Sequence, residues 1–358
     1  MTQTNRMGKW HKARPIAPGT KHPMRKLLHL AGRAWSFVAG NLEGPNFIIK
    51  HSGHVPAFMQ TAVTQLRQKG KVAHAIKDIE SCFPSMPHED IRTAMREETR
   101  RLALHKGVSG VVVPRFSDTK PCRYMTSSTP QTSKKHVYLS FDTLLDIMGF
   151  TLDNPIIQMP DGTLRHQRQG IPMGDPLSPG MCITTCAWME RRWLGTLTPE
   201  QKETFRVARY MDDMLMFIAE RPDRSHTAIL HDFEKACYKP LKLEDGAPNT
   251  FLETQFAIQN QDIRFWLKND NAQGENKIWR YQHYKSHSPF LQKQAVLTAC
   301  LRKVQKMSSD NDTLYDSGLA KVREFSRLAY PPTVLRGACT YLGATTGTYK
   351  WYEIRDQI

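Results

Sequence analysis

The chain has 358 residues, enough for two or three subdomains, and its apolar fraction of 40% is typical of a globular protein, not a disordered one. Lys and Arg outnumber Asp and Glu by 50 to 34, a formal charge of +16, which indicates a polyanionic partner such as nucleic acid. No apolar run reaches membrane-spanning length, and the polar, basic first residues do not resemble a secretory signal peptide. We therefore expect a protein of the cytoplasm or nucleus that is not secreted and has no membrane partner.

The positive charge is clustered. Residues 1–50 hold nine Lys or Arg and one acidic residue, Glu43, and residues 100–140 hold eight and one, Asp118. Such clustering favours a binding surface over a basic protein that is merely soluble.

The seven cysteines contain no Cys-x-x-Cys pair, so we expect neither disulfides nor zinc, in keeping with an intracellular protein. Cys182 and Cys186 are four residues apart in an expected helix and could touch on one face. Small buried residues are the favoured interpretation of this pair.

The first expected elements are a strand over residues 10–16 and helices over residues 21–37 and 53–68. Lys12 and Arg14 alternate on one side of that strand. Gly70 ends the second helix, and an apolar-rich strand then leads to Asp78. Pro84 and Pro87 close the segment that contains Asp78.

The middle of the chain is expected to alternate helices with irregular segments. A helix over 87–104 is followed by residues 107–138, whose Gly, Pro, Ser and Thr predict an irregular basic loop that contacts nucleic acid or a partner. A helix over 139–150 follows. Residues 155–169 then predict a hairpin with Asp161-Gly162 as its turn.

A loop punctuated by Gly and Pro runs from Gln169-Gly170 to Ser178-Pro179 and enters a helix over 180–194. Such a loop lets the backbone approach a ligand closely. Asp175 is expected to order the loop by accepting a hydrogen bond from a nearby N–H.

Asp212 and Asp213 lie between two short apolar runs rich in Val, Tyr, Phe and Ile, which predicts a hairpin with the pair at its tight turn. Adjacent carboxylates repel, and in apolar surroundings they need a partner. Divalent cations such as Mg²⁺ prefer carboxylate oxygens, and two of them about 3.5–4 Å apart promote in-line attack at phosphorus. A solvated turn is the alternative, which the apolar flanks oppose. Asp78 is the candidate third carboxylate.

The last third is expected to contain a helix over 224–238, strands over 252–258, 263–267 and 277–284, and then a group of helices. Ser288-Pro289 is typical of a helix start, with Ser288 as its cap, and that helix runs to Lys306. A polar, acidic loop over 308–318 separates it from helices over 318–330 and 333–342. Residues 343–358 form a tail too aromatic to be wholly disordered.

Three segments in this order carry a resemblance. Asp78 with Phe83 five residues on, Gln169-Gly170 with Ser178-Pro179, and Tyr210-Met-Asp-Asp213 resemble palm motifs A, B and C of a reverse transcriptase. The resemblance covers residues 10–305. Pro172-Met-Gly174, Phe251-Leu-Glu253 and Ser286-His-Ser-Pro289 are similar to the branch that contains Penelope-like elements and telomerase, among the non-LTR reverse transcriptases.

This resemblance implies an α+β right-hand polymerase with fingers, a palm whose antiparallel sheet is backed by helices, and a helical thumb. The implied divisions are the N-terminal part of the fingers (1–71), the palm with motif A (72–106), the basic insertion with a fingers and palm helix (107–150), the palm with motifs B, C, D and the primer grip (151–285), and the thumb with the C-terminal tail (286–358).

The implied activity is that of an RNA-directed DNA polymerase that extends a primer 3′-hydroxyl with dNTPs. Asp78, Asp212 and Asp213, with the carbonyl of Ile79, would hold two Mg²⁺ ions, and Mn²⁺ is a tolerated substitute. Phe83 would lie near the sugar of the incoming nucleotide and exclude a 2′-hydroxyl. An ordinary core Phe is the alternative for that residue.

The resemblance also implies contacts to substrate. Lys12 and Arg14 would grip the triphosphate, Gln169 would contact the incoming nucleotide or the template base, and Gly170 would permit close approach of the backbone. Lys239 or Lys242 would protonate the departing pyrophosphate. Solvated surface positions are the alternative for these four basic residues. The implied contacts to primer and duplex come from Trp279, Tyr281, Lys293 and Lys303.

The implied partners are an RNA template, a DNA or RNA primer and dNTPs. No RNase H, integrase or endonuclease segment is recognisable, so either accessory proteins supply such activities or this chain is the compact core of a longer protein. A viral RNA-directed RNA polymerase is an alternative, opposed by Phe83 and by Gln169-Gly170. A catalytically inactive, polymerase-like nucleic-acid-binding protein is another, opposed by the three carboxylates, because unneeded buried charges are costly.

Overall fold

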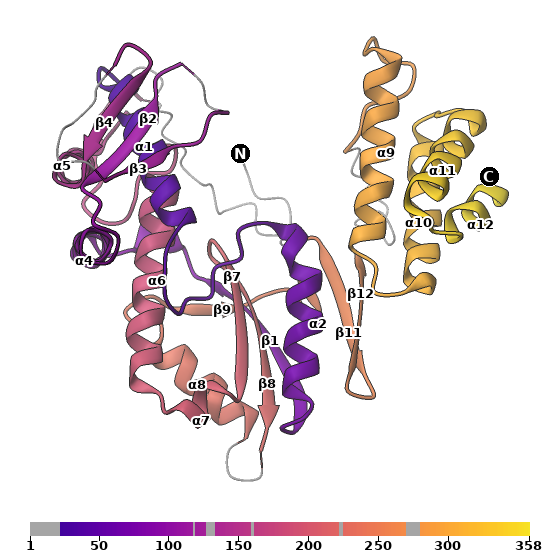
Figure 1. The fold of residues 1–358 in the computed structure, drawn as a ribbon, viewed down its shortest axis with the longest axis horizontal. Coiled ribbons are helices and arrows are strands. Elements are labelled where there is room, and N and C mark those ends of the chain that lie inside the picture. Colours follow the sequence, from indigo (N-terminus) through magenta and orange to yellow (C-terminus); the bar gives the residue numbers. More distant parts are fainter. Residues whose placement is uncertain (1–21, 117–118, 127–132, 159–160, 222–224, 270–279) are drawn as a thin grey trace. The chain divides into compact units, whose positions relative to one another are not determined.

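The computed structural model describes residues 22–116, 119–126, 133–158, 161–221, 225–269 and 280–358, and Figure 1 labels their helices and strands. The helices are α1 (Arg25–Gly40), the 3₁₀ turn η2 (Ser52–His54), α2 (Val55–Leu66), α3 (Cys82–Ser85), α4 (His88–Lys106), α5 (Phe141–Asp153), α6 (Ser178–Thr196), α7 (Pro199–Lys202), α8 (His226–Ala236), α9 (Phe290–Lys306), α10 (Asn311–Arg327), α11 (Pro332–Thr346) and α12 (Lys350–Asp356). The strands are β1 (Lys71–Ile79), β2 (Gly110–Pro114), β3 (Arg123–Met125), β4 (His136–Ser140), β5 (Ile156–Gln158), β6 (Leu164–His166), β7 (Phe205–Tyr210), β8 (Asp213–Glu220), β9 (Leu243–Asp245), β10 (Thr250–Phe251), β11 (Thr254–Gln259) and β12 (Asp262–Leu267). Among these residues no helix is both long and apolar enough to cross a membrane.

The chain divides into two compact units. Unit 1 takes its described residues from Met1–Ile48, Asp78–Thr198 and Leu230–Glu244, and unit 2 from Ile49–Lys77, Pro199–Ile229 and Asp245–Ile358. A four-stranded sheet has the order β7-β8-β1-β9. Strand β1 starts in unit 2 and ends in unit 1, since its last two residues are Asp78 and Ile79.

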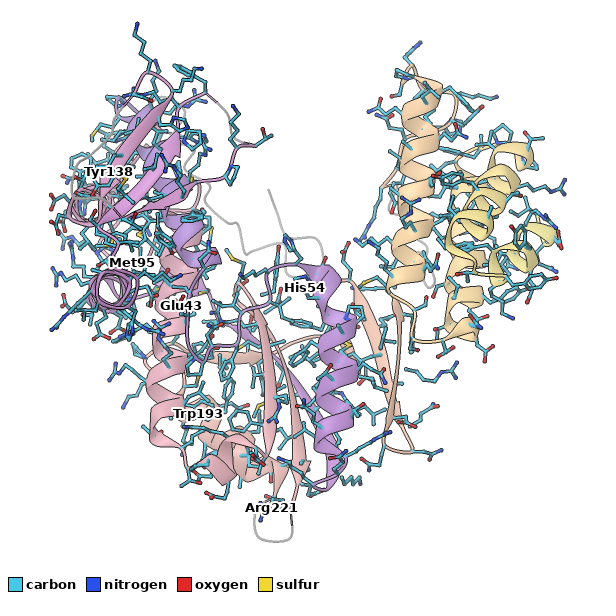
Figure 2. All side chains as sticks on the ribbon, viewed as in Figure 1. Glu43, His54, Met95, Tyr138, Trp193 and Arg221 are labelled. Carbon is cyan, nitrogen blue, oxygen red and sulfur yellow. The ribbon has the colours of Figure 1, made fainter. Side chains whose placement is uncertain are left out.

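Unit 1 is built around α6, which packs against α1 and α4. A Cβ atom on Gly32 of α1 would stand 2.4 Å from the Pro176 carbonyl oxygen, and one on Gly180 of α6 would stand 2.8 Å from the Cβ of Trp35. Glycine at these two positions therefore allows α1 to lie directly on the start of α6. Trp193, labelled on α6 in Figure 2, meets the ring of Phe233 edge-on at 5.2 Å.

The region expected to be an irregular basic loop contains an antiparallel sheet, so that prediction is wrong. The strand order is β3-β2-β4, and Val111 pairs with Tyr124 on one side and with Leu139 on the other. The reason is the run of three valines at the centre of β2, all buried, because β-branched residues favour a pleated, packed surface. The Gly, Pro, Ser and Thr residues that predicted a loop lie mostly between these strands.

The core of unit 2 joins segments distant in sequence. One face of α2 packs with the β7–β8 hairpin and with the β11–β12 hairpin, and Figure 1 shows α2 beside these strands. Phe217 of β8 lies between Phe58 of α2 and Phe256 of β11, with ring centroids 6.1 and 5.9 Å apart. These ring contacts tie β8 to both α2 and β11.

The four C-terminal helices share one core, and the expected helical group is therefore present. Trp351 of α12, which lies in the expected aromatic tail, is fully buried among residues of α9, α10 and α11. The predicted loop over 308–318 is wrong, because α10 starts at Asn311. Asp310 caps that helix by accepting hydrogen bonds from the N–H groups of Asp312 and Thr313.

Two further expectations for this region need correction. Residues 280–284 form no strand, and the rest of the strand predicted over 277–284 lies outside the described residues. Ser288 does not cap α9, because the N-cap position is held by Pro289 and the Ser288 hydroxyl instead donates to Gln282.

Candidate active site

Asp212 and Asp213 lie at the turn of the β7–β8 hairpin, as predicted. Tyr210 pairs with Asp213 across the two strands, so Met211 and Asp212 form a two-residue turn. The φ of Met211 is 58°, in the left-handed region that residues other than glycine rarely adopt. Asp212 is half-buried and Asp213 is exposed, while residues 214–219 behind them are buried. The turn therefore presents two carboxylates on a rigid apolar support.

A buried arginine holds this turn. Arg209 is fully buried, and its Nη1 donates a 2.8 Å hydrogen bond to the carbonyl of Met211. The Arg209 carbonyl accepts from the N–H of Ile49 at 2.8 Å. Burying a guanidinium is costly without partners, and this one is used to hold the main chain of the turn that carries Asp212. The sequence carried a signal that was missed, since Arg209 is a charged residue next to Val207 and Ala208, at a position of β7 that the apolar pattern predicts to be buried.

Asp78 is the penultimate residue of β1, the neighbour of β8 in the sheet order. Asp78 is half-buried, with its Oδ1 atom shielded from solvent, and Ile79 is 1% exposed. The N–H of Glu80 donates to the carbonyl of Lys242 at 2.9 Å. This bond places Lys242, at the start of β9, beside the end of β1.

Lys239 and Lys242 are both exposed, and only Lys242 has this main-chain link to the Asp78 segment among the hydrogen bonds of the described residues. Lys239 precedes Pro240 across a cis peptide bond. The placement favours Lys242 as the lysine next to the carboxylate-bearing strand.

The segment after Asp78 turns sharply. Ser81 has a φ of 51°, and the one-turn helix α3 follows with Phe83 half-buried at its second position. The N–H of Ile171 donates to the carbonyl of Phe83 at 2.6 Å. The structure thus brings together the two expected nucleotide-binding segments of unit 1, the one around Phe83 and the one around Gly170.

Gly170 is required at this junction on two grounds. Its φ is 79°, and a Cβ atom there would stand 2.3 Å from the carbonyl oxygen of Pro84 and 2.5 Å from that of Phe83. The close approach that the sequence suggested is therefore made to the protein's own backbone. The side chain of Gln169 is exposed, and its Nε2 donates to the carbonyl of Ser85 at 3.3 Å.

His88 adds a contact that the sequence did not reveal. Its Nε2 lies 2.8 Å from the carbonyl oxygen of Gly170, so Nε2 carries a proton and donates it. Its partner lies 82 residues away, and no local pattern could have shown the contact.

Asp175 orders the loop that leads into α6, as expected. Its Oδ1 accepts from the N–H of Leu177 at 2.7 Å, and the Ser178 hydroxyl donates to the carbonyl of Pro172 at 2.6 Å. Burial raises the pKa of the Asp175 carboxyl, and the Leu177 hydrogen bond and the charge of His22 partly offset this rise.

The described residues that were expected to contact primer and duplex, Tyr281, Lys293 and Lys303, have protein partners. Lys293 is 7% exposed, and its ammonium donates to the carbonyls of Tyr284 and Ser286, both at 2.6 Å. The structure therefore gives Lys293 the role of a structural lysine at the start of α9. Tyr281 stacks on Phe325 at 4.8 Å in the core of the C-terminal helices, and burial raises its pKa. Lys303 is ion-paired with Glu253.

Three other expected site residues, Lys12, Arg14 and Trp279, lie outside the described residues.

Comparison with known proteins identifies the fold. No protein-family model and no curated protein sequence matches the chain. Telomerase from Candida albicans, solved in complex with the TWJ fragment of telomeric RNA, superimposes with a TM-score of 0.59 at 13% identity, over 93% of this chain and 54% of that one. Apo telomerase from Candida tropicalis gives 0.48 at 14% identity, over 94% and 60%. The RNA-dependent RNA polymerase from bacteriophage phi12 gives 0.38 at 8% identity, over 86% and 43%.

This chain therefore spans between about half and three fifths of the length of the telomerase chains that it resembles. It has an α+β right-hand polymerase fold, as the sequence predicted.

Proposed function

We propose that this protein is an RNA-directed DNA polymerase, a reverse transcriptase that extends a primer 3′-hydroxyl with dNTPs on an RNA template. One observation carries the proposal. On a right-hand polymerase fold, Asp212 and Asp213 lie at the turn that opens β8, and Asp78 lies at the end of β1, the neighbouring strand of the sheet.

The donor set suits hard divalent cations. Three carboxylates and the main-chain carbonyl of Ile79 are oxygen ligands, the kind that Mg²⁺ prefers, and Mn²⁺ is the tolerated substitute. Asp78, Asp212 and Asp213 would hold two such ions. When bound, the ions would lower the pKa of the primer 3′-hydroxyl and neutralise charge on the triphosphate and on the departing pyrophosphate.

The protein's own residues would position the substrates. The main chain of Gly170 and Ile171 packs on the main chain of Phe83, and the Phe83 ring would leave no room for a 2′-hydroxyl and so favour dNTPs. The exposed Gln169 side chain would contact the nucleotide or the template base. Lys242, next to the Asp78 strand, would donate a proton to the leaving pyrophosphate, in preference to Lys239.

The remaining expected contacts stay as proposals. Lys12 and Arg14 would grip the triphosphate, and Arg suits this role because its planar guanidinium binds phosphate oxygens at two points. Trp279 would hold the primer end. The Candida albicans telomerase that resembles this chain was solved with an RNA fragment, which supports an RNA template here. Accessory proteins would supply nuclease activities.

Primer extension tests the proposal. The full chain would be given an RNA template, a labelled primer and Mg²⁺, with either dNTPs or NTPs, beside the variants Asp212→Asn and Asp262→Asn. Asp262 is the matched control, because it also lies at a hairpin turn of unit 2 but pairs with Arg67 on the surface. We expect extension with dNTPs only, abolished in Asp212→Asn and kept in Asp262→Asn.

Extension with NTPs in preference to dNTPs would instead assign the protein to the RNA-directed RNA polymerases. Salt-sensitive binding of primer and template without any extension would indicate a catalytically inactive binding protein.

A further inference from the structure

Three cysteines of unit 1 meet in the core beside the Phe83 segment. Cys82 starts α3, and Cys182 and Cys186 lie on α6. Their sulfur atoms all lie within 4.8 Å of one another, and the Sγ atoms of Cys82 and Cys182 are 3.5 Å apart. The three side chains are at most 2% exposed. Two of these thiols come from one helix and the third from a segment 100 residues earlier, so the cluster depends on the tertiary fold.

The spacing suits a tetrahedral metal centre. Cys182 and Cys186 are four residues apart on α6 and therefore lie on the same face of the helix. Thiolate sulfurs bind zinc at about 2.3 Å, which places the sulfurs of one tetrahedral site about 3.8 Å apart. The Cys82–Cys182 separation of 3.5 Å is close to that value, and the other two separations do not exceed 4.8 Å, so small rotations of the side chains would suffice to bind a shared ion.

We propose that Cys82, Cys182 and Cys186 form a binding site for a soft divalent cation of the zinc class. Three thiolates carry a charge of −3, and a divalent ion leaves less uncompensated charge in this apolar environment than a monovalent ion such as Cu⁺. No fourth His, Cys, Asp or Glu ligand joins the cluster in the part of the chain that the structure describes. The fourth coordination position is open to a water molecule.

This inference revises the expectation of no zinc, which rested on spacing in the sequence. Cys182 and Cys186 are buried, as predicted, but local spacing could not show that Cys82 completes the set.

Binding of the cation exchanges protons for metal. Hydrogen bonds with Cys182 and Cys186, together with burial, raise the pKa of the Cys82 thiol. Each thiol loses its proton to solvent as its sulfur binds the ion, which releases three protons per ion. Affinity therefore rises with pH.

The bound ion would cross-link two segments of unit 1. Cys82 immediately precedes Phe83, and α6 begins directly after the loop of Gly170 and Asp175. A metal at the cluster would thus stiffen the Phe83 segment independently of any ions held by Asp78, Asp212 and Asp213.

Cobalt is the probe for this site, because thiolate ligation of Co²⁺ produces a charge-transfer absorption in the near ultraviolet that carboxylate ligation lacks. The reduced full chain would be titrated with Co²⁺ in excess Mg²⁺, beside Cys82→Ala, Cys182→Ala and Cys186→Ala. Cys339→Ala is the matched control, since Cys339 is equally buried but lies in α11. Co²⁺ affinity would be compared at pH 8 and pH 6, and thermal unfolding would be followed with and without Zn²⁺.

We expect one Co²⁺ per chain with the thiolate band, displacement of Co²⁺ by Zn²⁺, weaker binding at pH 6, and a higher unfolding temperature with Zn²⁺. Each cluster variant should lose at least tenfold in affinity, and Cys339→Ala should keep it. Absence of the thiolate band in the wild-type chain would overturn the proposal, and so would its persistence in all three cluster variants. If an alanine variant does not fold, the wild-type titration still tests the proposal, because absence of the thiolate band there overturns it.

Discussion

The two loops proposed to act on the substrates are held in different ways. In unit 1, the Phe83 segment is held by main-chain contacts, since Gly170 packs on the carbonyls of Phe83 and Pro84 and Ile171 donates to Phe83. In unit 2, the turn with Asp212 is held by the guanidinium of Arg209, a buried charge. Neutral main-chain contacts fix the shape of the loop that is proposed to discriminate between deoxyribose and ribose. A buried cation instead supports a turn that has to carry two negative charges.

Among substitutions that change how the two loops are held, the largest loss of activity is expected where Gly170 packs on the main chain of Phe83 and Pro84. Gly170→Ala would place a Cβ atom 2.3 Å from a carbonyl oxygen at a φ of 79°, so Phe83 and the loop must move apart. A displacement of about 1 Å at a reacting centre costs roughly a hundredfold in rate, and we expect at least that loss of dNTP incorporation. Single-turnover incorporation and thermal unfolding would measure it.

Gly162→Ala is the matched control for that substitution. Gly162 has a φ of 83°, but no atom within 4 Å would meet an added Cβ atom. Both variants bear the left-handed strain of about 1–2 kcal/mol, and only Gly170→Ala bears the collision. Equal losses of activity in the two variants would show that the junction has no special role.

A smaller effect is expected from removing the charge that holds the Asp212 turn. Arg209→Met keeps most of the buried volume but leaves the Met211 carbonyl without its 2.8 Å donor. We expect kcat to fall by roughly tenfold to a hundredfold, with little change in the KM for dNTP, because Arg209 would position the carboxylates without touching the nucleotide.

Arg206→Met provides the comparison on the same strand. Arg206 donates to Gln65 and to the carbonyls of Lys202 and Phe205, away from the turn. We expect its kcat to stay within about threefold of the wild type. If both arginine variants lose kcat equally, the Arg209 guanidinium does not have the specific role inferred for it.

The sequence predicted elements wherever one local pattern decides the structure. The helices of residues 88–106 and 290–306, and the hairpins of β7–β8 and β11–β12, follow from periodicity and turn residues. The sheet of β2, β3 and β4 was missed, because β3 has only three residues and is defined by pairing with β2. The start of α10 was missed, because Asp310 caps a helix in a run whose composition resembles a loop.

In the candidate site too, features set by local sequence were predicted and contacts set by the tertiary fold were not. The sequence placed Asp78, Asp212 and Asp213 at strand ends and marked Gly170 as a point of close approach. The contacts of His88 and Arg209 with main-chain carbonyls could not be predicted. Every residue has a main-chain carbonyl, so the residue type of the partner does not indicate such a contact. Nor could Lys293 be recognised as buried, since its partners are also carbonyls.

The smallest effect concerns charge within the loop that main-chain contacts hold. Burial raises the pKa of the Asp175 carboxyl, so ionising this group destabilises the folded protein. The free energy of unfolding therefore falls as pH rises through the raised pKa of Asp175 in the folded state. Asp175→Asn removes the ionisation but keeps an oxygen for the Leu177 N–H. We expect it to raise the unfolding temperature at pH 7 by a few degrees, about 1 kcal/mol or less.

That gain should vanish below the ordinary Asp pKa of about 3.9, where the wild-type carboxyl is protonated in both states. Asp161→Asn should lack the gain, because hydrogen bonds from Thr163 lower the pKa of Asp161. Thermal unfolding across this pH range would measure both variants. A difference for Asp175→Asn that does not depend on pH would contradict the assigned cause.

The most direct test of the proposed activity is the selection between deoxyribose and ribose at Phe83. Single-nucleotide incorporation opposite an RNA template would be measured for the wild-type chain and for Phe83→Val, with one dNTP and with the matching NTP. We expect the wild type to prefer the dNTP, and Phe83→Val to narrow that preference by roughly tenfold or more while dNTP incorporation changes only severalfold. A wild-type preference for the NTP would contradict the assignment as a reverse transcriptase, and a dNTP preference that is unchanged in Phe83→Val would contradict the role of Phe83.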